Sequence, residues 1–151
     1  MKKTLGKSGL KEINEEISRQ FSIPDFFDKK DIVALDDFGY AKNGVRIFFR
    51  IQEYLVPSLR HLLTNQFLKH VHVDSGAVKF IVSGADVMRP GVTFIDPAIT
   101  QGDVIAVLDA THKKPLAVGI ALFSAPDMTA LPKGKVVKTI HYVGDKYWAE
   151  K

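Results

Sequence analysis

The chain has no cysteine among its 151 residues, and this absence removes several kinds of chemistry. Without thiols there is no disulfide, no thiolate nucleophile and no cysteine-ligated zinc. No apolar run approaches the roughly 20 residues that a membrane-spanning helix needs. Residues 1–6 lack the apolar segment of a signal peptide. These absences favour a protein of the reducing cytoplasm with no membrane partner.

The sequence also lacks the short motifs that accompany common enzyme chemistries. It contains no GxSxG, no phosphate loop ending in GK[ST], no GxGxxG and no HExxH. The segment Lys133-Gly134-Lys135 has neither the upstream glycine nor the following hydroxyl residue of a phosphate loop. We therefore expect no catalytic activity, no cofactor and no metal.

Charge and hydrophobic content set broad limits on function. The 21 Lys and Arg residues exceed the 17 Asp and Glu residues, which gives a net charge of +4. Such an excess permits nucleic-acid binding without requiring it. The hydrophobic content of 46% is enough to bury a core in one domain or in two small ones.

The first seventy residues mix helical and β patterns. Apolar residues at helical spacing from Leu10 to Phe21 predict an amphipathic helix that ends before Pro24. Two β-rich runs, 32–35 and 45–51, flank a connection with the turn pair Asn43-Gly44, and we expect them to form an antiparallel pair. After Pro57, a second helix is predicted from its apolar residues Leu59, Leu62, Leu63 and Phe67.

The stretch 73–92 has the most informative local pattern. It predicts a strand, a capped helix, a glycine stop, a second strand and a tight Pro-Gly turn. Asp74 and Ser75 are good N-cap residues, and Gly84 is suited to a left-handed helix end. The helical spacing of Ala77, Phe80 and Ile81 predicts that these side chains face a core.

From residue 71 onward, short strands alternate with turns. The runs 104–108 and 116–123 are β-rich, residues 124–131 form a predicted helical turn, and residues 136–148 are expected to close the domain as a hairpin across Gly144-Asp145. Short, regularly spaced strands indicate a compact barrel or a folded sheet. The change of pattern places a domain boundary near residue 70.

These motifs resemble a known family. The ordered series from Val71 to Trp148, including Lys133-Gly134-Lys135, resembles a PUA domain, an RNA-binding module. A narrower resemblance, to the malignant T-cell-amplified-sequence proteins and their archaeal relatives, is carried by residues 56–63, 73–80 and 140–142. The resemblance implies an α+β fold, with an N-terminal α/β pre-PUA domain over 1–70. A C-terminal PUA pseudo-barrel of short strands with one main helix would follow over 71–151.

What the resemblance implies about function is an RNA-binding adaptor of translation without catalytic activity. Members of that family associate with the small ribosomal subunit, act with the density-regulated protein, and influence initiation, re-initiation, recycling and release of tRNA. The expected partners are therefore ribosomal RNA of the small subunit or tRNA, with a density-regulated-protein-like chain as a further partner.

In PUA domains the RNA-facing groove is formed by the first helix, the glycine loop and the following strand, beside the last strand. The matching positions here are Gly76, Lys79, Gly84, Ala85, Val87, Met88, Arg89, Gly91, Lys135, Lys138, His141 and Tyr142. Arg89 departs from the eukaryotic pattern, in which an uncharged residue often precedes the Pro-Gly turn. Its side chain would contact phosphate or pair with Asp86.

Other interpretations stay open from the residues alone. PUA domains also hold RNA for tRNA- or rRNA-modifying enzymes, so the chain could be an accessory subunit of such an enzyme. A protein-interaction module is a third class, with an apolar surface formed by Phe26, Phe27, Phe48 and Phe49.

Four polar side chains raise further questions. His70, His72 and Asp74 alternate and would share one face of a strand, which permits a metal site but is better explained by an exposed strand followed by a helix cap. His141 suits a structural hydrogen bond better than acid–base chemistry.

Overall fold

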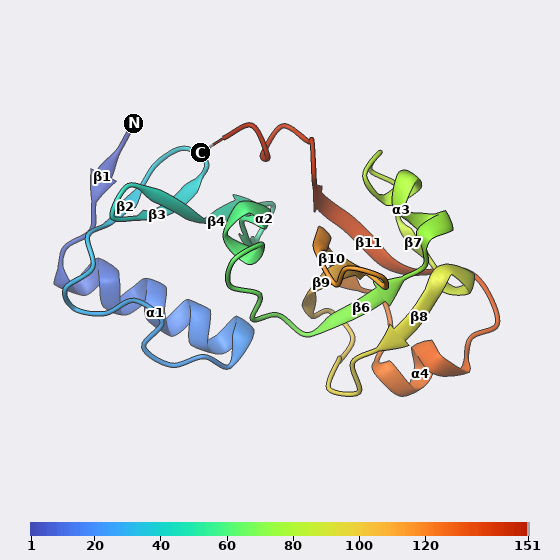
Figure 1. Cartoon of the computed structure of the whole chain (residues 1–151). Helices are drawn as coiled ribbons and strands as arrows, with labels where there is room; N and C mark the ends of the chain where they lie inside the picture. The colour runs from blue at the N-terminus through green and yellow to red at the C-terminus, as the bar shows by residue number, and fades with distance from the viewer. Residues whose placement is uncertain (151) are drawn as a thin grey trace. The chain divides into compact units, whose positions relative to one another are not determined.

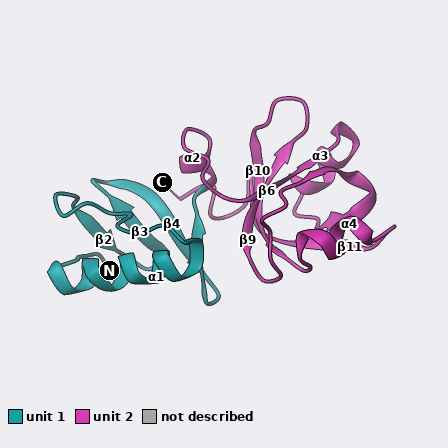
Figure 2. Ribbon diagram, turned by 90° about the horizontal axis from the view of Figure 1, so that it is seen from below, with its two compact units in different colours: residues 1–58, 151 teal, residues 59–150 magenta. Residues whose placement is uncertain are grey.

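The computed structural model describes residues 1–150, which fold into two compact units (Figures 1 and 2). The first unit comprises residues 1–58 and the second residues 59–150. Within the described residues, no helix has the length and apolar character that crossing a membrane requires.

The first unit consists of one long helix and a five-stranded antiparallel sheet. The elements are β1 (Lys3–Thr4), α1 (Lys7–Phe21), β2 (Val33–Leu35), β3 (Gly39–Lys42), β4 (Val45–Ile51) and β5 (Tyr54–Pro57), and the strands lie in chain order. Helix α1 confirms the amphipathic prediction, because Ile13 and Ile17 are buried. It ends at Ser22, whose backbone is left-handed with φ 60°.

The predicted direct pairing of runs 32–35 and 45–51 is wrong. Strand β3 lies between β2 and β4 and pairs with both. The Asn43-Gly44 turn is present, but it joins β3 to β4, and its positive φ values of 50° and 84° suit a two-residue hairpin. The sequence of β3, Gly-Tyr-Ala-Lys, has no β-branched residue and only Tyr40 favours a strand, so the propensity signal was weak.

Aromatic packing forms the core of the first unit. Phe27, Phe48 and Phe49 are buried, and the ring centroids of Phe26 and Phe48 lie 5.2 Å apart. The proposed apolar docking surface of Phe26, Phe27, Phe48 and Phe49 is therefore wrong, because these side chains stabilise the fold from within.

The second predicted helix is shorter than its pattern indicated. Helix α2 covers Leu59–Leu62, with Leu59 and Leu62 buried and Leu63 exposed. The chain then turns, and the side chain of Gln66 accepts a hydrogen bond from the Leu68 amide at 2.7 Å. Helix α2 contacts strand β10 of the second unit, so the compact units divide ahead of the predicted domain boundary near residue 70.

The second unit is built on a six-stranded sheet. Its elements are β6 (His70–Val73), α3 (Ser75–Ile81), β7 (Val87–Met88), the 3-10 turn η1 (Arg89–Gly91), β8 (Val92–Ile95), β9 (Val104–Asp109), β10 (Pro115–Ala121), α4 (Ala125–Ala130) and β11 (Lys135–Tyr142). The strand order is β7-β11-β10-β9-β6-β8, with only β6 and β9 parallel among the paired neighbours.

This sheet curls into a nearly closed pseudo-barrel, as predicted, around a core that includes Val71, Ile105, Val107, Ala117 and Val137 (Figure 1). A register shift lies between Val118 and Gly119 on β10. Irregularities of this kind increase the local twist and help a sheet to close.

The predicted closing hairpin over 136–148 is wrong. Strand β11 ends at Tyr142, and turns rather than a return strand follow. The carboxylate of Asp145 accepts hydrogen bonds from the backbone amides of Tyr142 at 2.8 Å and Trp148 at 2.7 Å. An aspartate that bonds nearby amides stabilises a turn in place of a strand ladder.

Candidate nucleic-acid interface

Helix α3 begins where the sequence predicts, after Asp74, and its last residue is Ile81, three residues before the predicted stop at Gly84. Asp74 is the N-cap, and its carboxylate accepts a hydrogen bond from the Ala77 amide at 3.0 Å. After the helix, Gly84 adopts a left-handed backbone with φ 95°. A Cβ atom at Gly84 would lie 3.0 Å from the ring of Tyr142, so this position requires glycine for both reasons.

A groove of about 540 Å³ lies beside this helix. Helix α3, strand β7, turn η1 and the start of β11 contribute its walls. Its lining residues are Asp74, Gly76, Ala77, Phe80, Ile81, Ala85, Asp86, Val87, Met88, Pro90, Gly91 and Lys135. Six of the predicted site residues therefore meet here: Gly76, Ala85, Val87, Met88, Gly91 and Lys135.

Phe80 is not a core residue, contrary to the prediction. Its side chain is 58% exposed, whereas the adjacent Ile81 is 2% exposed and packs in the core. Consecutive helical residues point about 100° apart, and in α3 Ile81 faces the core while Phe80 faces solvent. Phe80 and the half-exposed Met88 give the groove an apolar lining that is suited to flat rings.

The polar part of the groove is an ion pair. The ammonium group of Lys135 lies 2.8 Å from the carboxylate of Asp86, which also accepts a hydrogen bond from the Thr139 amide at 2.8 Å. Burial raises the pKa of Asp86, but the hydrogen bonds from Lys135 and Thr139 and the charges of Lys135 and Lys138 together lower it by more, so the pKa falls below its ordinary value. Asp86 thus stays ionised and holds Lys135 at the groove.

Arg89 does not pair with Asp86, so that prediction is wrong. Its guanidinium donates to two backbone carbonyls, from Nε to Met128 at 2.9 Å and from an Nη atom to Val92 at 3.2 Å. The side chain is half-buried and joins turn η1 to helix α4. Arg89 therefore positions the turn that borders the groove.

The other predicted site residues do not line the groove. Lys79 is exposed, with its ammonium group 5.2 Å from the centroid of the Phe80 ring, and Lys138 is exposed on β11. His141 is fully buried, and its Nε2 accepts a hydrogen bond from the Leu59 amide. Tyr142 packs against the core and Gly84.

The metal interpretation of His70, His72 and Asp74 gains no support from the geometry. The carboxylate of Asp74 caps α3, and the two imidazoles stack on each other with centroids 5.1 Å apart. Across residues 1–150, no three histidine, aspartate or glutamate side chains converge to hold a metal ion.

Some groove residues were missed at the sequence level. Asp86, Pro90 and the exposed ring of Phe80 line the groove, but none was predicted to do so.

Comparison with known proteins places this geometry in context. Residues 69–143 match the PUA domain, an RNA-binding module, and the predicted fold class is confirmed. A hypothetical protein from Pyrococcus horikoshii, known from its crystal structure, superposes with a TM-score of 0.85 at 34% identity, over 98% of each chain.

Sequence relatives narrow the assignment. An uncharacterised protein of Methanocaldococcus jannaschii is 40% identical, with 95% of this chain and 93% of the relative aligned. Malignant T-cell-amplified sequence 1-B of Xenopus laevis and translation machinery-associated protein 20 of Eremothecium gossypii are each 38% identical over 70% and 72% of this chain, respectively. The chain spans less than two thirds of those two relatives, at 61% and 64% of their lengths.

A PUA pseudo-barrel with a groove between its first helix and the Pro-Gly turn defines the class: PUA-domain proteins, with RNA as the partner. The chain belongs to the malignant T-cell-amplified-sequence family of PUA-domain proteins, including its archaeal relatives. The relative from Eremothecium gossypii is named as a protein associated with the translation machinery.

Proposed function

We propose that this protein is a non-catalytic adaptor of translation in the cytoplasm that binds structured RNA, either on the small ribosomal subunit or at the acceptor end of tRNA. The contact surface is the groove between helix α3 and turn η1. A density-regulated-protein-like chain is the proposed protein partner.

The observation that carries the proposal is the composition of this groove. Gly76 and Gly91 line the groove without side chains, and Phe80 and Met88 supply exposed apolar surface. Lysines 79, 135 and 138 lie on or beside it. Glycines without side chains allow close approach of an RNA backbone, lysines neutralise phosphates, and an exposed ring stacks on an unpaired base.

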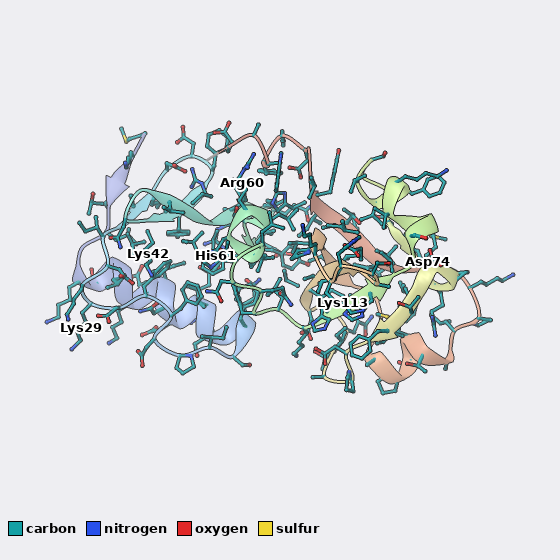
Figure 3. The ribbon with its side chains drawn as sticks, in the orientation of Figure 1. Lys29, Lys42, Arg60, His61, Asp74 and Lys113 are labelled. Carbon is teal, nitrogen blue, oxygen red and sulfur yellow. The ribbon has the colours of Figure 1, made fainter. Side chains whose placement is uncertain are left out.

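The test uses a charge reversal that leaves the ion pair of Lys135 intact. In Lys79→Glu/Lys138→Glu, two exposed lysines beside the groove change sign. The matched control, Lys29→Glu/Lys30→Glu, makes the same change in net charge on exposed residues of the first unit (Lys29 is labelled in Figure 3). Both variants and the unaltered chain are compared by co-sedimentation with purified small ribosomal subunits and by filter binding to tRNA.

We expect the groove variant to lose binding and the control variant to keep it. Binding of the unaltered chain should weaken as salt rises, because phosphate contacts release counterions, and the groove variant should reduce the slope of log K against log salt by about 2. Equal losses in both variants would point to net charge alone. No binding to subunits or tRNA by the unaltered chain would contradict the proposal.

A further inference from the structure

Three flat side chains form a second surface on the pseudo-barrel, apart from the groove. On strand β6, His70 and His72 alternate with the fully buried Val71 and Val73, so the two imidazoles lie on the face away from the core. Phe94 on strand β8 is directly opposite His72 in the strand register. None of these three residues lines the groove. We call His70, His72 and Phe94 the ring cluster.

The three rings of the cluster share nearly one orientation. The ring centroids lie 5.1 Å apart for the two histidines, 5.6 Å for His70 and Phe94, and 4.8 Å for His72 and Phe94. The interplanar angles are 17°, 29° and 33°. A linear stack would make one distance about twice the others, so the rings form a triangular, offset arrangement. Phe94 is 41% exposed and the two histidines are half-buried, which leaves the cluster open to solvent.

Charges of both signs lie near the cluster, and Asp96, whose amide donates a hydrogen bond to the carbonyl of His70, follows β8 in the chain. Lys113 lies in the turn between β9 and β10 and is labelled near strand β6 in Figure 3. Burial lowers the pKa of His72 below its ordinary value, and the nearby positive charge of Lys113 lowers it further. Lys114 follows it in the chain and is exposed. The one nearby carboxylate that acts on His72, Asp109, is occupied by the backbone amide and ring of His112.

We propose that the ring cluster stacks on unpaired bases of the bound RNA while Lys113 and Lys114 contact the adjacent phosphates. This inference rests on the proposed function and adds to it a second contact surface, specific for single-stranded segments. Partly exposed flat rings suit a nucleobase because a base offers a flat π surface of its own, and base–aromatic stacking tolerates any base identity. Lysines beside the rings complement the phosphate that accompanies each base.

The experiment separates stacking from charge. Fluorescence anisotropy measures binding of the full chain to a ten-nucleotide oligoadenylate and to a ten-unit abasic oligonucleotide with the same number of phosphates. The variants are Phe94→Leu, which removes the aromatic ring but keeps apolar volume, and Phe94→Tyr, which keeps an aromatic ring. The groove variant Lys79→Glu/Lys138→Glu and the thermal unfolding of every variant complete the set.

We expect Phe94→Leu to weaken binding of oligoadenylate about tenfold and to leave binding of the abasic oligonucleotide unchanged, while Phe94→Tyr binds both like the unaltered chain. Equal affinity of Phe94→Leu and the unaltered chain for oligoadenylate would overturn the ring cluster as a base-stacking surface and leave the groove proposal intact. Failure of the unaltered chain to bind subunits, tRNA or either oligonucleotide would overturn both proposals.

Discussion

The backbone amide of Leu59 donates a hydrogen bond to Nε2 of His141 at 3.1 Å, across 82 positions of the sequence. The other ring nitrogen, Nδ1, lies 2.9 Å from the carboxylate of Asp145. Since Nε2 accepts, the proton of the neutral ring is on Nδ1 and is donated to Asp145. These two hydrogen bonds of the buried His141 ring join the start of helix α2 to the end of strand β11.

Replacing this histidine should destabilise the second unit. His141→Leu leaves the Leu59 amide without an acceptor and removes one donor from Asp145, whose side chain is 7% exposed. We expect a loss of about 2–4 kcal/mol in the free energy of unfolding, measured by urea denaturation. His112→Leu, at an exposed histidine, is the matched control and should change stability by no more than about 0.5 kcal/mol. Similar small effects in both variants would contradict the structural role of His141.

Arg89 should act on stability rather than on phosphate binding. Arg89→Ala removes the hydrogen bonds to the carbonyls of Met128 and Val92, and we expect a loss of about 1–3 kcal/mol. The slope of log K for RNA against log salt should stay unchanged, because no phosphate contact is lost. A slope reduced by about 1 in a variant of unchanged stability would instead assign a phosphate contact to Arg89.

The two glycines of the α3 region should respond differently to alanine. Gly84→Ala places a Cβ 3.0 Å from the Tyr142 ring at a left-handed φ, and we expect a loss of about 1–2 kcal/mol in the free energy of unfolding. At Gly76 the nearest atom to a new Cβ is the Asp74 carboxylate oxygen at 3.4 Å, so Gly76→Ala should fold normally. Thermal unfolding of both variants tests this contrast, and equal destabilisation would count against it.

The first unit should lose stability in acid through Asp36. A hydrogen bond from Arg46, opposed by burial and assisted by the amides of Phe38 and Gly39, lowers the pKa of Asp36 to about 2. Because the folded pKa lies below the unfolded one, the stabilisation is fully present above about pH 4 and is lost as the pH falls towards 2.

Asp36→Asn tests this pH dependence. The variant should be less stable at neutral pH by about 2 kcal/mol or more, since Arg46 is only 6% exposed and loses its charge partner. Its stability should then fall less steeply than that of the unaltered chain between pH 4 and pH 2. Parallel stability curves, measured by urea denaturation at each pH, would exclude Asp36 as the titrating group.

The sequence by itself determined the features that depend on neighbouring residues. Asp74 caps α3 because its carboxylate reaches an amide three residues away, and Asn43-Gly44 forms its turn because both residues tolerate positive φ. Helix α1 follows from apolar residues at helical spacing. The PUA motif order was also sufficient to bring six of the predicted site residues to one groove.

Only the tertiary structure decided which partner each side chain takes. Asp86 pairs with Lys135 and not with Arg89, because β7 and β11 are neighbours in the sheet while Arg89 reaches the carbonyl of Met128. Phe80 is exposed, whereas the adjacent Ile81 is buried in the core. Such outcomes depend on contacts between residues far apart in the chain, which helical and strand periodicity do not encode. For the same reason, His70, His72 and Phe94 form one surface only after β6 and β8 pair.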